Sequence, residues 1–207
     1  MKKTLVMLAL LGMLVLPAYA ITEMVYDFKD GTTSGWNVPD WQGDSKDYVT
    51  TAVSVGTDEA ITGNALMVVG DFPGNKWRAS CAEREFNMDM TGYSSISADI
   101  YLPKKAHTEL LQARIILTVG PWYFVEMRSP VKLERGKWTT VKAKLDVNNK
   151  NETDYWRVKE NDSPKGLLSN ITRVRRVAIR IEYNASSEKN TGEPYNGPVY
   201  VSNITLK

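Results

Sequence analysis

The 207-residue chain has one cysteine, Cys81, and one histidine, His107. A single cysteine excludes a disulfide within the chain. Its neighbours Ala79 and Ala82 in a strand-like run indicate a buried, inert thiol. A Ser-His-Asp or Cys-His arrangement would depend on the one histidine, in the charged turn PKKAHTE. A zinc site needs three or four converging ligands. The single cysteine and the single histidine therefore argue against an intrachain disulfide, a histidine-dependent catalytic nucleophile and a zinc site.

An excess of charge of one sign is also missing. The chain has 26 Lys and Arg against 24 Asp and Glu, and without Lys2 and Lys3 the two counts would be equal. The one basic group that stands out is Arg173, Arg175 and Arg176. Affinity for nucleic acid depends on several Lys or Arg meeting phosphates. We therefore expect no nucleic-acid partner.

The only long apolar run covers residues 5–16, after a positively charged start and before the small-x-small sequence Ala18-Tyr19-Ala20. This pattern is typical of a signal peptide cleaved after Ala20. The run is too short to span a bilayer comfortably, although an uncleaved anchor is the alternative. We expect a signal peptide at 1–20 and one domain at 21–207, secreted or periplasmic, with no membrane span after cleavage.

Residues 111–146 alternate between apolar and polar side chains. Ala113, Ile115 and Leu117 share one face of a first strand, and Gly120-Pro121 separates it from an aromatic, β-branched run at 122–127. A third strand begins at Trp138, after a turn. Three strands in about 35 residues without helical periodicity predict an antiparallel, all-β protein.

Further strands are predicted along the rest of the chain, at a spacing typical of a β-sandwich. They lie at residues 24–28, 48–55, 65–69, 77–88, 95–102, 174–183 and 198–206. Residues 148–165 and 184–197 read as polar loops, and 164–170 as a possible helical turn.

Four phrases carry a family resemblance: VYDFKDGTTSGW, RGKWTTVKAKLD, VRRVAIRIEY and GPVYVSNITL. In this order they resemble the β-jelly-roll carbohydrate-binding modules of the galactose-binding-like superfold, over nearly all of residues 21–207. The resemblance implies a two-sheet antiparallel sandwich. Its first and last strands would be adjacent in one sheet, and the concave face of the other sheet would be open to a glycan. No numbered family follows from these phrases.

The resemblance also implies a structural calcium, held by an acid after the first strand and another in the closing strand. Lys29 and Ser202 stand at those positions. Calcium prefers carboxylate and carbonyl oxygens. We therefore expect no metal and no cofactor, with the Lys29 ammonium partly in the place of the ion. Asp27 and Asp30 are still present, so an ion held by other ligands is the alternative.

For sugar binding, an indole or phenol face packs on the C–H face of a pyranose, while planar polar side chains bond to its hydroxyls. By the resemblance, the concave sheet should hold the strands of Tyr48, Trp77, Arg114, Trp122 and Arg180. Strand alternation in VAIRIEY places the apolar residues inward and the charged residues outward.

The predicted ligand-binding set follows from this placement. Trp122 is the expected stacking platform, with Arg114, Arg180, Glu126 and Glu182 as hydrogen-bonding partners and Trp77 as a rim aromatic. The alternative for the same residues is a cross-strand ion-pair ladder on an ordinary surface, with Trp122 buried because the strand parity is reversed. Trp77 could equally belong to the core.

The remaining aromatic residues have separate expectations. Trp36 and Trp138 are assigned to the core. Trp41, Tyr155 and Trp156 are placed in polar loops, at the edge of a groove or packed within the loops. The strand after Trp77 has an inconsistent alternation, which a bulge near residues 83–85 would reconcile.

These observations predict an exported, non-catalytic protein that binds a polysaccharide or oligosaccharide. A structural or protein-interaction β-sandwich of the cell envelope is one alternative. The other is a small glycan-active hydrolase or lyase, in which two carboxylates such as Glu126 and Glu182 would lie about 5–10 Å apart in a cleft.

Overall fold

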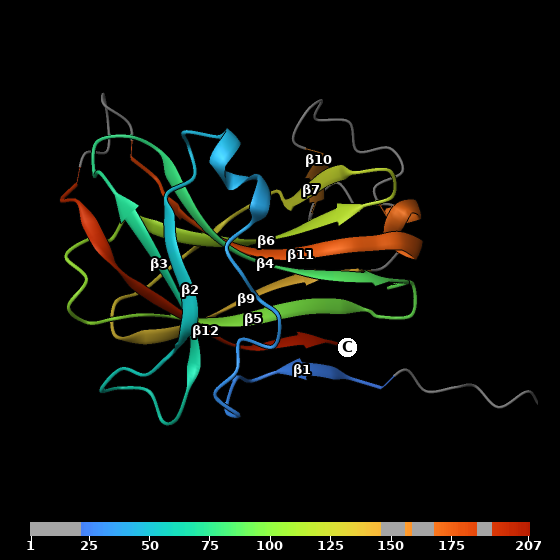
Figure 1. Ribbon diagram of the computed structural model, residues 1–207, viewed down its shortest axis with the longest axis horizontal. Helices are drawn as coiled ribbons and strands as arrows, with labels where there is room; N and C mark the ends of the chain where they lie inside the picture. The colour runs from blue at the N-terminus through green and yellow to red at the C-terminus, as the bar shows by residue number, and fades with distance from the viewer. Residues whose placement is uncertain (1–21, 146–155, 159–167, 186–191) are drawn as a thin grey trace, which may run out of the picture.

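The computed structural model describes residues 22–145, 156–158, 168–185 and 192–207. The predicted signal peptide, Tyr155 and Pro164 lie outside the described residues. Two antiparallel sheets pack face to face (Figure 1), so the predicted all-β sandwich is confirmed. Within these ranges, two short 3-10 turns accompany the strands, η1 (Asp40–Asp44) and η3 (Leu168–Arg173). None of the helical segments described is long and apolar enough to cross a membrane.

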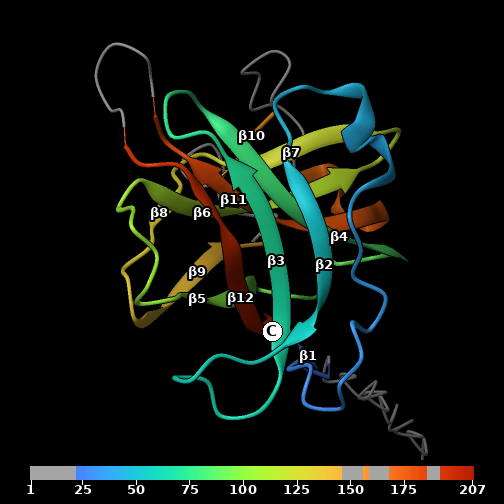
Figure 2. The ribbon, with the colours of Figure 1, turned by 60° about the vertical axis from the view of Figure 1, so that its left-hand side comes forward.

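Sheet A has the strand order β2-β3-β12-β5-β9, with β1 paired to β12. The bounds are β1 (Met24–Tyr26), β2 (Thr50–Gly56), β3 (Ala65–Phe72), β5 (Ser95–Leu102), β9 (Lys137–Lys144) and β12 (Tyr195–Leu206). Met24 lies opposite Leu206, so the first and last strands are adjacent, as the resemblance implied. Figure 2 shows β2, β3 and β12 side by side in front of the second sheet.

Sheet B has the order β10-β7-β6-β11-β4, with β8 paired to β6. The bounds are β4 (Arg78–Met88), β6 (Leu111–Val119), β7 (Tyr123–Met127), β8 (Val131–Lys132), β10 (Trp156–Val158) and β11 (Val174–Tyr183). In the centre of this sheet Arg180 lies opposite Arg114 on one side and opposite Cys81 on the other. The outward side chains of β6 and β11 are therefore brought into one row.

The core lies between the two sheets and takes the inward residues of each strand. Trp36 is fully buried there, as predicted. Trp138 is not, because on β9 the core residues are Val141 and Ala143, and Trp138 has the opposite parity. The loop assignment of Trp156 is also wrong, since this residue begins β10 and is fully buried. The position of each residue in its strand, and not its hydrophobicity, therefore decides whether it is buried. Trp138 is on the outer face of β9, and Trp156 is buried in β10.

The bulge predicted near residues 83–85 lies slightly farther along β4 and is not what accounts for the alternation of this strand. On β4, Ala82 and Phe86 face the core while Ala79 and Cys81 face outward, so a single alternation holds through this part of the strand. The pairing with β11 becomes irregular between Glu85 and Met88. The sequence was misleading because Ala79 and Cys81 are buried on the outer face, under side chains from other segments.

Candidate functional site

The outer face of sheet B is partly covered by η1 and by Tyr48, which bridges to Ala79 outside any named strand. The expectation that Tyr48 begins a strand of this sheet is wrong, because the strand that follows it, β2, belongs to sheet A. Four aromatic rings form a row across the face. Trp41 lies 6.2 Å from Phe124 and 4.8 Å from Tyr48, and Tyr48 lies 6.5 Å from Trp77, all edge to face.

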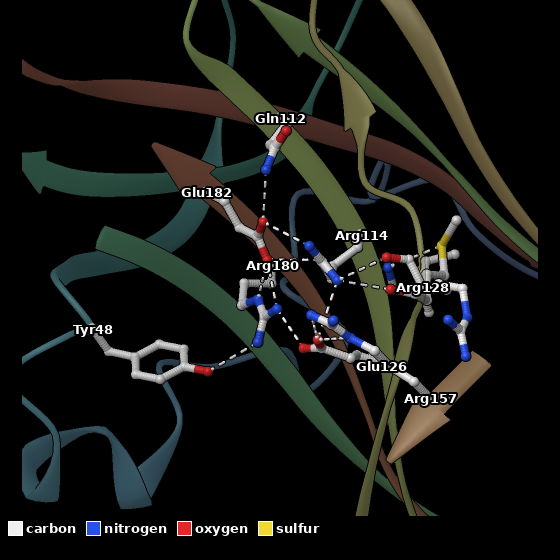
Figure 3. Close-up of polar contacts among 10 residues, drawn as sticks. Tyr48, Gln112, Arg114, Glu126, Arg128, Arg157, Arg180 and Glu182 are labelled. Carbon is white, nitrogen blue, oxygen red and sulfur yellow. Dashed lines mark hydrogen bonds and ion pairs between the residues drawn. The ribbon is translucent and has the colours of Figure 1, made fainter. Parts of the chain in front are cut away.

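The four charged residues predicted for the site come together in one cluster, with Tyr48 beside Arg180 (Figure 3). Arg114 comes from β6, Glu126 from β7, and Arg180 and Glu182 from β11. They are 6%, 1%, 2% and 1% exposed, respectively. The burial is physically tolerable only because each charge meets an opposite one.

The contacts of this buried network are short and shared. Nη2 of Arg180 lies 2.5 Å from carboxylate oxygens of both Glu126 and Glu182. Arg114 lies 2.7 Å from Glu182 through Nε and 3.1 Å from Glu126 through Nη1. The cross-strand ion pairs expected in the alternative are therefore present, but they are buried and do not lie on an ordinary solvated surface. A ligand-binding role for these four residues stays a prediction.

Burial by itself raises the pKa of Glu126, but Arg180, Arg114 and Arg157 outweigh it and hold that pKa below its usual value. For Arg180, burial lowers the pKa of the guanidinium, and the charges of Glu182 and Glu126 more than reverse this, so the pKa is raised. Burial raises the pKa of the Tyr48 phenol to about 12. Arg180 donates a hydrogen bond of 3.2 Å to this phenol oxygen, which fixes Tyr48 above the network.

A second polar group lies farther along the same face. Arg176 of β11 is 2.9 Å from Asp40, 3.1 Å from Glu83 and 3.2 Å from Glu85. The indole nitrogen of Trp41 donates to Glu83 at 3.1 Å. Burial is the main cause that raises the pKa of Glu83.

These residues line a groove of about 370 Å³ between β4 and the segment that leads into η1. Its walls are Gly35, Asn37, Val38, Pro39, Asp40, Glu83, Arg84, Glu85 and Arg176. Carboxylate, amide and guanidinium groups dominate this lining, so the groove is suited to a neutral ligand rich in hydroxyl groups.

Trp122 lies one residue before β7, in the turn after β6, and is 58% exposed. It is not part of the strand, and it is not buried as the reversed parity would require. Arg175 stacks on its ring at 4.3 Å, and Arg176 lies 5.5 Å from the ring centre. Arg175 also donates to the carbonyl of Gly120 at 2.7 Å, which braces the turn. The exposed indole therefore lies beside the groove, because Arg176 belongs to both.

Trp77 is half-buried and lies outside the main core, and its role as a rim aromatic stays a prediction. It packs in a small cluster on the outer face with Tyr48, and Arg180 lies 5.8 Å from its ring. Strand parity places Phe124 on the same face as Glu126. No local pattern predicts that Trp41 joins it there, because this contact links a loop to a strand far along the chain. Strand parity alone could have placed Glu83, Glu85 and Arg176 outward.

At the position of the calcium site implied by the resemblance, the Lys29 ammonium lies 3.1 Å from the Asp27 carboxylate. The Ser202 hydroxyl donates to the Asp27 carbonyl at 3.3 Å. A cation paired with the acid closest to the site disfavours a second, divalent cation there. In the part of the chain that the structure describes, no three Asp, Glu, His or Cys side chains converge on a metal position. That no ion is bound stays a prediction.

Glu126 and Glu182 do not have the setting of a glycosidase pair. A general acid needs a raised pKa and contact with the substrate. The pKa of Glu126 is lowered, and both carboxylates are almost completely buried and bonded to the same arginine. The arrangement is suited to holding the face together.

No protein-family model matches the chain, and no curated protein matches its sequence. Among solved structures, one similar protein is CBM27-1 of Caldicellulosiruptor saccharolyticus in complex with mannohexaose, with a TM-score of 0.55, 19% identity, and coverage of 91% of this chain and 98% of that one. A CBM28 described as specific for non-crystalline cellulose has a TM-score of 0.56 and 17% identity over 88% and 92% of the two chains.

A family 11 module of a Clostridium thermocellum cellulosomal cellulase has a TM-score of 0.51 and 15% identity, covering 90% of this chain and 95% of that one. Identities this low describe the fold and assign no numbered family. The resemblance found in the sequence is confirmed at that level: the chain has the β-sandwich fold of carbohydrate-binding modules.

Proposed function

We propose that the protein is an exported, non-catalytic carbohydrate-binding protein, and that it binds a polysaccharide or oligosaccharide on the outer surface of sheet B. The observation that carries this proposal is the exposed indole of Trp122 beside the polar groove, with Arg176 in contact with both. An apolar platform next to planar hydrogen-bonding groups is the arrangement that a pyranose ring requires.

The parts of this surface have different tasks. Trp122, braced by Arg175, would stack on a sugar ring. Asp40 and Asn37 in the groove would bond to hydroxyl groups of the neighbouring residue. A volume of about 370 Å³ lies near the lower end of the range for ligand pockets, about 300–1,000 Å³, so the groove would hold a short stretch of a chain.

The other predicted site residues would act from below the surface. Arg114, Glu126, Arg180 and Glu182 hold Tyr48, and through it Trp77, in a fixed row. A row of aromatic edges that cannot move costs less entropy on binding than a flexible one. In this proposal the four buried charges position the binding face and do not meet the ligand directly.

The N-terminal 20 residues support export, since they have the pattern of a signal peptide. A secreted or periplasmic protein would meet polysaccharides there. The similar modules were solved or described with mannohexaose, non-crystalline cellulose and a β-1,3-1,4-mixed-linked tetrasaccharide. Mannan, amorphous cellulose and mixed-linkage β-glucan are therefore the first probes.

The test is retention in affinity gels containing soluble mannan or mixed-linkage β-glucan, with a pull-down on amorphous cellulose. Trp122→Ala should weaken binding by about two- to thirteenfold from the lost stacking alone, because stacking contributes about 0.5–1.5 kcal/mol beyond the area it buries, and about 1.4 kcal/mol is tenfold. Asp40→Ala should weaken it less. Val25→Ala on β1 is the control, since Val25 is exposed on sheet A. Unchanged retention of Trp122→Ala on a glycan that the parent protein binds would reject the site.

A further inference from the structure

The outer face of sheet A carries an aromatic row of its own. Trp138 on β9 lies opposite Tyr101 on β5, and Tyr101 lies opposite Tyr200 on β12. The ring centres are 5.5 Å and 6.4 Å apart. Tyr101 and Tyr200 are buried, whereas Trp138 is 42% exposed. The row therefore presents one accessible indole on a rigid aromatic base.

Polar groups lie next to this indole on the same face. Thr140 is two residues along β9 from Trp138, and it is paired with Asp99 of β5. The Asp99 carboxylate accepts hydrogen bonds from the Thr140 hydroxyl at 2.6 Å and from the Asn203 amide at 2.9 Å. Thr140 and Asn203 are exposed, so hydroxyl, amide and carboxylate groups flank the indole at the surface.

The other end of the row opens into a cavity. Tyr200 donates to the carbonyl of Thr57 at 2.9 Å, and both residues line a space of about 700 Å³. The remaining lining residues are Asp58, Glu59, Lys104 and Lys105. Two carboxylates and two ammonium groups line the cavity, so their charges balance and the cavity does not favour a strongly charged ligand.

We propose that the outer face of sheet A is a second carbohydrate-binding site. A sugar ring stacks on Trp138, its hydroxyl groups bond to the Asp99, Thr140 and Asn203 group, and the chain continues toward the cavity beside Tyr200. Because this face is on the opposite side of the sandwich from Trp122, one protein molecule would bridge two polysaccharide chains or two stretches of one chain.

A neutral sugar fits this face better than a protein partner does. A stable protein interface buries about 800 Å² on each partner around an apolar core. Among the described residues of β5, β9 and β12, Trp138 is the only exposed large hydrophobic side chain, and its neighbours are polar. One indole surrounded by hydrogen-bonding groups is complementary to a pyranose ring, whose C–H face would stack on the indole while its hydroxyl groups meet the polar groups around it.

The test uses the full chain with mannohexaose, a mixed-linked tetrasaccharide and amorphous cellulose. Titration calorimetry compares the parent with Trp122→Ala, Trp138→Ala and the double variant. We expect two sugars bound per parent molecule and one per single variant. Adding Trp138→Ala to Trp122→Ala should lower the remaining affinity at least tenfold. Mixing the parent with polymer should produce turbidity through bridging, and either single variant should lose it.

Two further variants keep the outcome unambiguous. Lys142→Ala changes an exposed residue on the same face of β9, outside the proposed site, and should leave binding within about twofold. Trp138→Phe keeps an aromatic face and should retain part of the affinity. The proposal is overturned if Trp138→Ala has no effect in the Trp122→Ala background, or if the parent binds none of the three probes. If Trp138→Ala loses binding and Trp122→Ala binds as tightly as the parent, the site proposed on sheet B is refuted instead.

Discussion

Replacing Glu126 by alanine is expected to lower the free energy of unfolding by about 3–5 kcal/mol, the cost of removing one partner from a buried ion pair. Glu126 is buried between Arg114 and Arg180, at 3.1 Å and 2.5 Å. Without it, the two buried guanidinium groups have to share Glu182. Arg157 also pairs with Glu126, but its side chain is 38% exposed and can turn to water, so it adds little to the cost.

The assay is urea and thermal unfolding, in which this loss corresponds to a midpoint lowered by roughly 6–20 °C, at about 2–4 °C for each kcal/mol. Glu126→Gln keeps the shape and an acceptor oxygen, so its cost should be intermediate. The control is Glu134→Ala, because Glu134 pairs with Lys137 at 2.6 Å on the open surface and its loss should not change the midpoint. A cost for Glu126→Ala below about 1 kcal/mol would refute the view that burial makes this network matter.

Two further predictions concern acid and the core. Since Arg180, Arg114 and Arg157 lower the pKa of Glu126, its contribution is present above the ordinary value of 4.5 and is lost as pH falls through the lower folded-state pKa. Below pH 4.5, the urea midpoint of the parent should therefore fall more steeply than that of Glu126→Gln; parallel curves would contradict this. Trp156→Ala should cost about 3–5 kcal/mol in urea unfolding, because it removes a fully buried side chain whose indole donates to the Lys144 carbonyl at 2.7 Å, and Trp156→Phe should cost less. Equal costs for the two Trp156 variants would show that the cavity is not the cause.

Most strands could be read from local alternation. The strands predicted at 95–102 and 174–183 are present with those bounds, as β5 and β11. Their alternation also placed Arg180 and Glu182 on one face, where the structure has them. In a strand with one buried face, the alternation of apolar and polar residues shows which side chains face the core, so these strands can be assigned without knowing their partners.

The errors arose where contacts with residues far along the chain determine whether a side chain is buried. Trp156 was placed in a loop because its strand is three residues long, and its position depends on pairing with β7 at Met127. Ala79 and Cys81 are small and apolar, which by itself favours an inward position, yet Tyr48 and Trp77 bury them on the outer face. Burial on an outer face cannot be recognised from the strand that carries it.

By itself the sequence determined that this chain forms a two-sheet β-sandwich and that Arg114, Arg180 and Glu182 point to one side of it, while the side taken by Glu126 depended on a strand parity that was left open. Tertiary structure alone decided that these charges are covered and that the accessible indoles are those of Trp122 and Trp138. The physical reason is the range of the contacts. Alternation repeats every two residues, whereas the cover depends on Trp41 meeting Glu83, 42 positions away, and on Tyr48 meeting Arg180, 132 positions away.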